Sequence, residues 1–124
     1  MMMDYRNQPA LLRLVFNEFN FDALDLPLWM GRLPKPGKEM PIQEQQGTFL
    51  PLSASKNVSR KHAQIFWEGF GPYPGHYIIC ESRNGIRVND QILLPEYGPM
   101  RLDDRSRIQI GDHAFYVLLP SHIV

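Results

Sequence analysis

Apolar and polar residues alternate with a period of two along much of this 124-residue chain, and helical periodicity is scarce. Such alternation is typical of β-strands with one buried and one solvated face. The run from His113 to Leu119 is apolar on both faces, so we expect a strand inside the sandwich. The inward-facing positions of the alternating segments are predicted at Leu12, Leu14 and Phe16, at Ala63, Ile65 and Trp67, at Ile86 and Val88, and at Ile108 and Ile110.

Eleven prolines and nine glycines separate these segments. Gly111-Asp112 predicts a two-residue hairpin turn, and Asn89-Asp90 predicts a second one. The polar stretches 34–47, 53–57 and 69–75 are expected to be loops. Roughly ten short strands at regular spacing, with no internal repeat, predict an all-β fold, an antiparallel β-sandwich.

Composition narrows the class of protein. Thirteen basic and thirteen acidic residues give a net charge of zero, which argues against a general binder of polyanions. The lone Cys80 lies in an apolar run and is interpreted as a buried small side chain in a reducing compartment. No apolar stretch approaches the roughly 18 residues that span a bilayer, and the N-terminus lacks the layout of a signal peptide. We expect one soluble intracellular domain over residues 1–124, with its core at about 11–120 and a loop insertion at about 34–47. We expect no room for a further domain after the final strand. We also expect a monomer rather than an oligomer.

Donor-rich residues gather where predicted strands meet loops. Arg32 follows an apolar strand, Ser59 and Arg60 begin the run Ser-Arg-Lys-His, and Asn84 lies in Ser-Arg-Asn-Gly. Guanidinium, hydroxyl and carboxamide groups with little neutralising charge nearby suit an anion with several acceptor oxygens. We expect Ser59 and Arg60 to belong to a loop, with regular pairing starting near Lys61. A phosphate group on a protein side chain is the leading candidate ligand.

Each motif also has a structural explanation. Asn-Gly is a common way to build a tight turn, and Gly85 provides the backbone freedom that such a turn needs. Ser-Arg-Lys-His is equally compatible with a solvated basic loop, and His62 with a hydrogen-bonded structural histidine. The specificity lies in the combination and order of the motifs.

In that order, these motifs resemble the forkhead-associated (FHA) domain. The resemblance rests on Gly31-Arg32, on Ser59-Arg60-Lys61-His62, on Asn84-Gly85 followed by Val88-Asn89, and on Ile108-Gln109-Ile110-Gly111. It runs from about Leu12 to Leu119. It implies a β-sandwich of about eleven strands with binding loops at one end, which recognises phosphothreonine in a partner protein during reversible signalling or assembly.

Carried over position by position, the resemblance implies that Arg32, Ser59 and Arg60 hold the phosphate. Asn84 would bond the peptide main chain beside the phosphothreonine. The architectural positions would be Gly31, His62 and Gly85, with His62 bracing the binding loops.

Two departures from the family pattern stand out. Arg83 occupies a position where many members have Ser or Thr, which hints at the forkhead transcription-factor branch. Arg83 would add a phosphate contact, favour doubly phosphorylated or acidic peptides, or face solvent. The second departure is the long 34–47 segment, whose prolines and charges suggest an inserted loop of unassigned role. The resemblance to this family implies a nuclear location, with the cytoplasm as the alternative.

Other functions fit less well. An enzyme is not expected, because Ser59 and His62 lack a nucleophile elbow around them. No metal or other cofactor is expected, because the four histidines are scattered. Nucleic acid is disfavoured as a direct partner by the zero net charge, and a membrane by the missing apolar span. A phosphate-independent protein-interaction β-sandwich domain is the main alternative, binding through the insertion or through residues 70–73.

Overall fold

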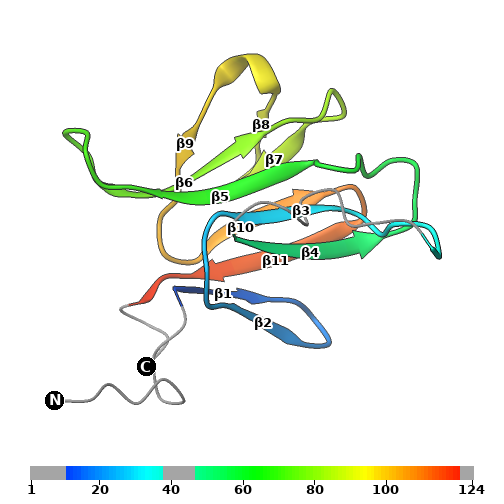
Figure 1. The fold of residues 1–124 in the computed structure, drawn as a ribbon. Coiled ribbons are helices and arrows are strands. Elements are labelled where there is room, and N and C mark those ends of the chain that lie inside the picture. The colour runs from blue at the N-terminus through cyan, green and yellow to red at the C-terminus, as the bar shows by residue number, and fades with distance from the viewer. Residues whose placement is uncertain (1–10, 38–46, 121–124) are drawn as a thin grey trace, which may run out of the picture.

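The computed structural model describes residues 11–37 and 47–120, which form two β-sheets packed face to face (Figure 1). The all-β class predicted from the alternation is therefore confirmed. A 3-10 turn, η2 (Pro95–Tyr97), lies between β8 and β9. The strands are β1 (Leu12–Val15), β2 (Asn20–Ala23), β3 (Leu28–Arg32), β4 (Thr48–Ser53), β5 (Ala63–Glu68), β6 (Gly75–Cys80), β7 (Ile86–Val88), β8 (Gln91–Leu93), β9 (Met100–Arg101), β10 (Ser106–Ile110) and β11 (His113–Leu118).

One sheet has six strands in the order β2-β1-β11-β10-β7-β8, and the other has five in the order β4-β3-β5-β6-β9. Neighbouring strands are antiparallel except for β3 and β4, which pair in parallel with a register shift between Gly31 and Arg32. Both strands run toward the same end, so the chain between Arg32 and Thr48 has to return across the sheet, as parallel pairing requires. Of the expected insertion at 34–47, residues 38–46 lie outside the described residues.

The core lies between the sheets and uses the positions that the alternation predicts. Alternate residues of the central strands are fully buried, whereas their neighbours face outward. Buried apolar area of this kind is the main stabilising contribution to folding. The core side chains include Leu12, Leu14, Leu28, Met30, Ile65, Ile78, Ile86, Val88, Ile108, Ile110, Phe115 and Val117.

Both predicted hairpin turns are present. Val88 pairs with Gln91 across Asn89-Asp90, and both turn residues have positive φ, 49° and 72°. Positive φ at both central positions matches the twist of the flanking strands, and Asn and Asp tolerate it. Ile110 pairs with His113 across Gly111-Asp112, where Gly111 has a positive φ of 58°.

Three local expectations need correction. Trp67 is 55% exposed, because β5 extends beyond the core toward the hairpin with β6. β11 lies in the middle of its sheet, but only one of its faces is buried, and Tyr116 on the other face is 49% exposed. Regular strand geometry in β5 starts at Ala63 rather than near Lys61.

Candidate functional site

The end of β3 and the loop before β5 are joined through their backbones. The N–H of Arg32 donates to the carbonyl of Ser59 at 2.9 Å, and Nε of Arg32 donates to the carbonyl of Val58 at 2.8 Å. A Cβ atom added to Gly31 would lie 1.9 Å from the carbonyl oxygen of Arg60. Only glycine allows this approach, and the approach holds the Arg32 guanidinium beside the loop.

The same loop is tied to the connection between β6 and β7. The hydroxyls of Ser59 and Ser82 are 2.7 Å apart, and the Ser82 hydroxyl also accepts the N–H of Asn84 at 3.1 Å. Nδ2 of Asn84 donates to the carbonyl of Asn57 at 3.0 Å. Three side chains from two loops therefore meet at the segment 57–59.

His62 is completely buried and links the two loops from beneath. Its Nδ1 accepts the N–H of Ser59 at 3.0 Å, so the ring hydrogen is on Nε2 and is donated to the carbonyl of Gly85 at 2.9 Å. Burial lowers the pKa of His62, although the Gly85 carbonyl opposes the shift. A neutral ring fits this arrangement, because a second ring proton would face the N–H of Ser59.

The turn after Ser82 depends on glycine. Gly85 has φ of +73°, and its N–H donates to the carbonyl of Ser82 at 3.0 Å. An L-residue is strained at this φ, so glycine keeps the turn compact. The turn presents Asn84 toward Asn57 and the Gly85 carbonyl toward His62.

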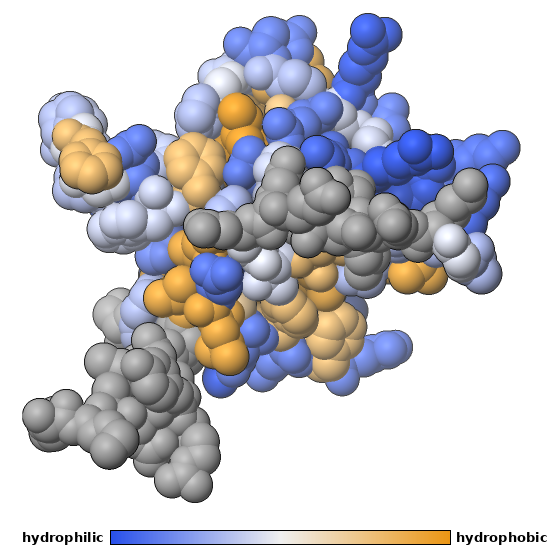
Figure 2. Space-filling model, in the orientation of Figure 1, coloured by the Kyte–Doolittle hydropathy of each residue, from blue (hydrophilic) through white to orange (hydrophobic). Residues whose placement is uncertain are grey.

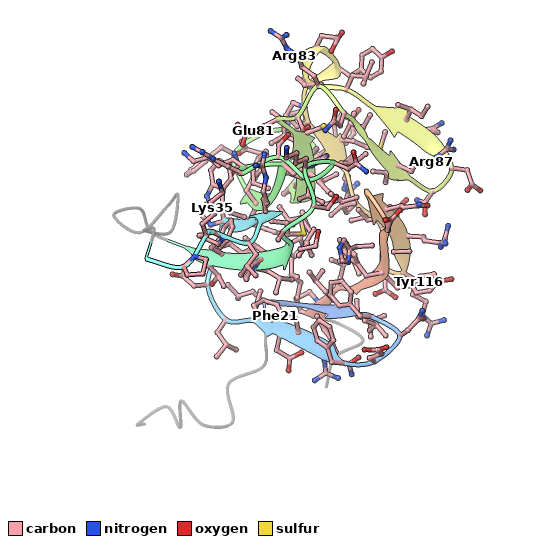
Figure 3. The ribbon with its side chains drawn as sticks, turned by 90° about the vertical axis from the view of Figure 1, so that its right-hand side faces the viewer. Phe21, Lys35, Glu81, Arg83, Arg87 and Tyr116 are labelled. Atoms are coloured by element: carbon pink, nitrogen blue, oxygen red, sulfur yellow. The ribbon has the colours of Figure 1, made fainter. Side chains whose placement is uncertain are left out.

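The predicted site residues fall into two groups. Arg32, Ser59 and Asn84 all make hydrogen bonds within or to the segment 57–59. Arg60 and Arg83 are exposed, with no hydrogen bond or ion pair from their side chains to the described residues. Arg83 lines a shallow pocket with Leu94, Pro95 and Glu96, and Figure 3 shows it pointing outward at the edge of the molecule.

Two residues of the sequence motifs, Ser82 and Lys61, were not among the predicted site residues, and their contacts were not foreseen. Ser82 is buried and joins Ser59 to Asn84, but only its place two positions before Asn84 could have indicated this role. Nζ of Lys61 lies 5.3 Å from the ring centroid of Trp29. This cation–π contact draws Lys61 toward the outer face of the five-stranded sheet.

Charge at this end of the molecule is mainly basic. Glu81 is the acidic residue next to this region, and it interacts electrostatically with Lys61. The two ion pairs found among the described residues, Asp22 with Arg13 and Asp104 with Arg105, lie elsewhere. The surface at the right in Figure 2, where the connection between β4 and β5 lies in Figure 1, is mainly hydrophilic. A solvated cationic surface at one tip of a neutral domain suits a small anionic ligand better than a long polyanion.

The described residues contain neither a group of side chains suited to hold a metal ion nor a helix long and apolar enough to cross a membrane.

Polar loops that meet at one end of a β-sandwich scaffold are a common place for binding residues. The model of the family described as "FHA domain" matches residues 30–111 of this chain. The chain therefore belongs to the FHA domain family, and the resemblance noted from the sequence is confirmed.

Relatives and solved structures agree with this assignment. The chain is 35% identical over 113 residues to the fork-head transcriptional regulator FHL1 of Candida albicans, covering 91% of this chain and 9% of that protein. It is 37% identical over 71 residues to the transcriptional activator FHA1 of Nicotiana tabacum, covering 56% of this chain and 32% of that protein. The chain thus spans at most about a third of these relatives.

The fold also matches the crystal structure of the MEK1 FHA domain in complex with a phosphothreonine peptide of HOP1. The TM-score is 0.62 at 17% identity, covering 89% of this chain and 97% of that domain. At this identity the comparison supports the fold alone.

Proposed function

We propose that this domain binds phosphothreonine in a partner protein, as a reversible recognition module without catalytic activity. The observation that carries the proposal is the meeting of Arg32, Ser59 and Asn84 at the segment 57–59. Membership of the FHA family and the phosphothreonine peptide bound by the MEK1 FHA domain support it.

The chemistry of the three side chains suits a dianion. Nε of Arg32 is held by Val58, which leaves both terminal nitrogens of the guanidinium for phosphate oxygens. When Ser82 donates to Ser59, the hydroxyl hydrogen of Ser59 is available to the ligand. Arg60 adds an exposed positive charge in the same loop.

Asn84 is proposed to bond the peptide main chain next to the phosphothreonine. One hydrogen of its amide is already donated to Asn57, which fixes the orientation of the side chain. The second hydrogen and the carbonyl oxygen remain for a peptide backbone, which offers one acceptor and one donor per residue.

Arg83 is proposed to act on the peptide at longer range, because it points outward at the edge of the molecule and lines a separate pocket with Leu94, Pro95 and Glu96. Its charge then attracts an anionic peptide without a fixed contact. Arg83→Ala should weaken binding at low ionic strength and have little effect near 1 M salt, where the Debye length is about 3 Å.

The expected affinity is moderate. A hydrogen bond to a charged group contributes roughly 1.5–3 kcal/mol. Three or four of them, less the cost of ordering a flexible peptide, leave about 7–8 kcal/mol, which corresponds to micromolar binding. Such binding is reversible enough for a signal written by a kinase and removed by a phosphatase.

The experiment is a titration with one threonine peptide in three forms: phosphothreonine, phosphoserine and unphosphorylated. The wild-type domain should bind only the phosphorylated forms, with phosphothreonine preferred because one buried methyl contributes about 1 kcal/mol. Arg32→Ala and Ser59→Ala should abolish or strongly reduce binding. Arg107→Ala is the matched control, because Arg107 is an exposed arginine on the outer face of the six-stranded sheet.

A second candidate function is phosphate-independent protein binding through the hairpin between β5 and β6. Phe70 is fully exposed there, and Tyr73 and Trp67 are 68% and 55% exposed. Three exposed aromatic rings close together in sequence are unusual on a solvated surface and common at interfaces. Equal binding of the phosphorylated and unphosphorylated peptides, lost in Phe70→Ala, would favour this function over the first.

The remaining expectations extend the proposal. We propose that the domain core covers about residues 11–120, that the domain is monomeric, and that nucleic acid and membranes are not its direct partners. A nuclear location accords with the transcriptional roles named for the relatives from Candida albicans and Nicotiana tabacum.

A further inference from the structure

A shallow pocket of ≈ 260 Å³ lies next to the proposed phosphothreonine site. Asn84 and Gly85 form one side of it, and Arg87, Ile92 and Gln109 are among the other lining residues. Asn84 thus belongs both to the proposed site, through its bond to Asn57, and to this pocket. A peptide held at Asn84 can continue into the pocket without leaving the protein surface.

The pocket is built from three neighbouring strands of the six-stranded sheet. In the register of the sheet, Ile92 of β8 lies opposite Arg87 of β7, and Arg87 lies opposite Gln109 of β10. The three residues form one cross-strand row. The row faces outward, because the residues before and after Arg87 in β7 are buried in the core.

The row combines an apolar surface with one positive charge. Ile92 is 55% exposed, and its Cγ2 atom lies 3.7 Å from the Cβ position of Gly85, so its methyl groups border the turn. Nε2 of Gln109 donates to the carbonyl of Gly111 at 3.3 Å, which holds this amide at the far side of the pocket.

No ion pair with another described residue neutralises the positive charge of Arg87. Asp90 and Asp112 are the acidic residues at the two turns beside this row, and neither forms an ion pair with Arg87. Within residues 11–37 and 47–120, no other carboxylate pairs with it either. The pocket therefore presents a guanidinium with free donors beside aliphatic carbon.

We propose that this pocket binds an acidic side chain, Asp or Glu, that flanks the phosphothreonine in the same peptide. The carboxylate accepts hydrogen bonds from the guanidinium of Arg87, and the methylene groups pack on Ile92. This inference rests on the proposed function and defines the substrate class more narrowly, as a phosphothreonine next to an acidic residue.

The test uses a phosphothreonine peptide library with randomised flanking positions, followed by one selected peptide. We expect the wild-type domain to select Asp or Glu at one flanking position. Replacing that residue by Gln or Asn should weaken binding about two- to fivefold, the range expected for a solvent-exposed ion pair. Arg87→Ala should weaken the acidic peptide to the same extent and remove the difference between the two peptides.

Two further variants sharpen the test. Arg87→Glu should reverse the preference, so that a peptide with Lys at that position binds better than the acidic one. Arg107 is another exposed arginine on the same face of the six-stranded sheet, but it does not line the pocket. Arg107→Ala should therefore retain the wild-type preference for the acidic peptide.

The outcomes separate the two levels of inference. Phosphate-dependent binding without an acidic preference, or with a preference that persists in Arg87→Ala, overturns the acidic pocket and leaves the proposed function intact. A wild-type domain that binds no phosphopeptide from the library overturns both.

Discussion

The buried histidine beneath the site provides the most direct test of how the loops are held. His62→Phe keeps a flat ring of similar size but removes the acceptor for the Ser59 N–H and the donor for the Gly85 carbonyl. A buried polar group that loses its partner costs about 1–3 kcal/mol. Gly85 is buried and Ser59 half-buried, so the free energy of unfolding should fall by about 2–5 kcal/mol in total.

Urea unfolding of the wild-type protein and of His62→Phe at pH 7.5, analysed with a common m-value, measures this loss of free energy of unfolding. His113→Phe is the matched control. His113 is half-buried at the start of β11, and its side chain makes no hydrogen bond to the described residues. Its substitution should change stability by less than about 1 kcal/mol.

A second measurement locates the effect. The amide N–H of Ser59 should exchange slowly with solvent in the wild-type protein and rapidly in His62→Phe, whereas amides in the middle of β10 stay protected. The reasoning fails if His62→Phe is no less stable than His113→Phe, or if exchange at Ser59 is unchanged.

Three further predictions follow from the same contacts. The free energy of unfolding should fall as the pH drops below about 6.5, because burial holds the pKa of His62 and of His76 below this ordinary value, whereas the same histidines in the unfolded chain take up protons near pH 6.5. Equal urea midpoints at pH 7.5 and 5.5 would contradict this prediction. Ser82→Ala should cost about 1–3 kcal/mol in urea unfolding, because its buried hydroxyl joins two loops, and it should weaken phosphothreonine peptides measurably in a titration. Gly31→Ala should lower the free energy of unfolding by about 2–4 kcal/mol in thermal or urea unfolding, because the added Cβ would meet a carbonyl oxygen at 1.9 Å. Gly71→Ala is the control: its Cβ would have nothing within 4 Å, so the free energy of unfolding should change by less than about 0.5 kcal/mol.

Sequence patterns predicted the local structure well where the cause is local. The turns at Asn89-Asp90 and Gly111-Asp112 depend on which residues accept positive φ, and both formed as expected. Alternation likewise identified the buried faces of β1, β7 and β10. In contrast, alternation cannot show where a strand leaves the core, and so Trp67 was wrongly assigned to the interior.

Contacts between segments that are distant in the sequence could not be predicted from the alternation of apolar and polar residues. Ser82 is separated from Ser59 by 23 positions, and their bond depends on how the two loops are placed by separate strands. The cation–π contact of Lys61 with Trp29, across different elements, was equally hidden. The parallel pairing of β3 and β4 also has no local signature, since both strands would look the same in an antiparallel pair.

The sequence by itself determined the fold class, the turns and the order of motifs that marks the family, because backbone preference and hydrophobic periodicity act over a few neighbouring residues. The tertiary structure alone decided which side chains meet. It placed Arg32, Ser59 and Asn84 at one segment and directed Arg83 outward. It also left Arg87 without an ion-pair partner among the described residues. Such meetings depend on the pairing and stacking of whole strands, so the position of each donor follows from the packed sandwich rather than from its neighbours in the chain.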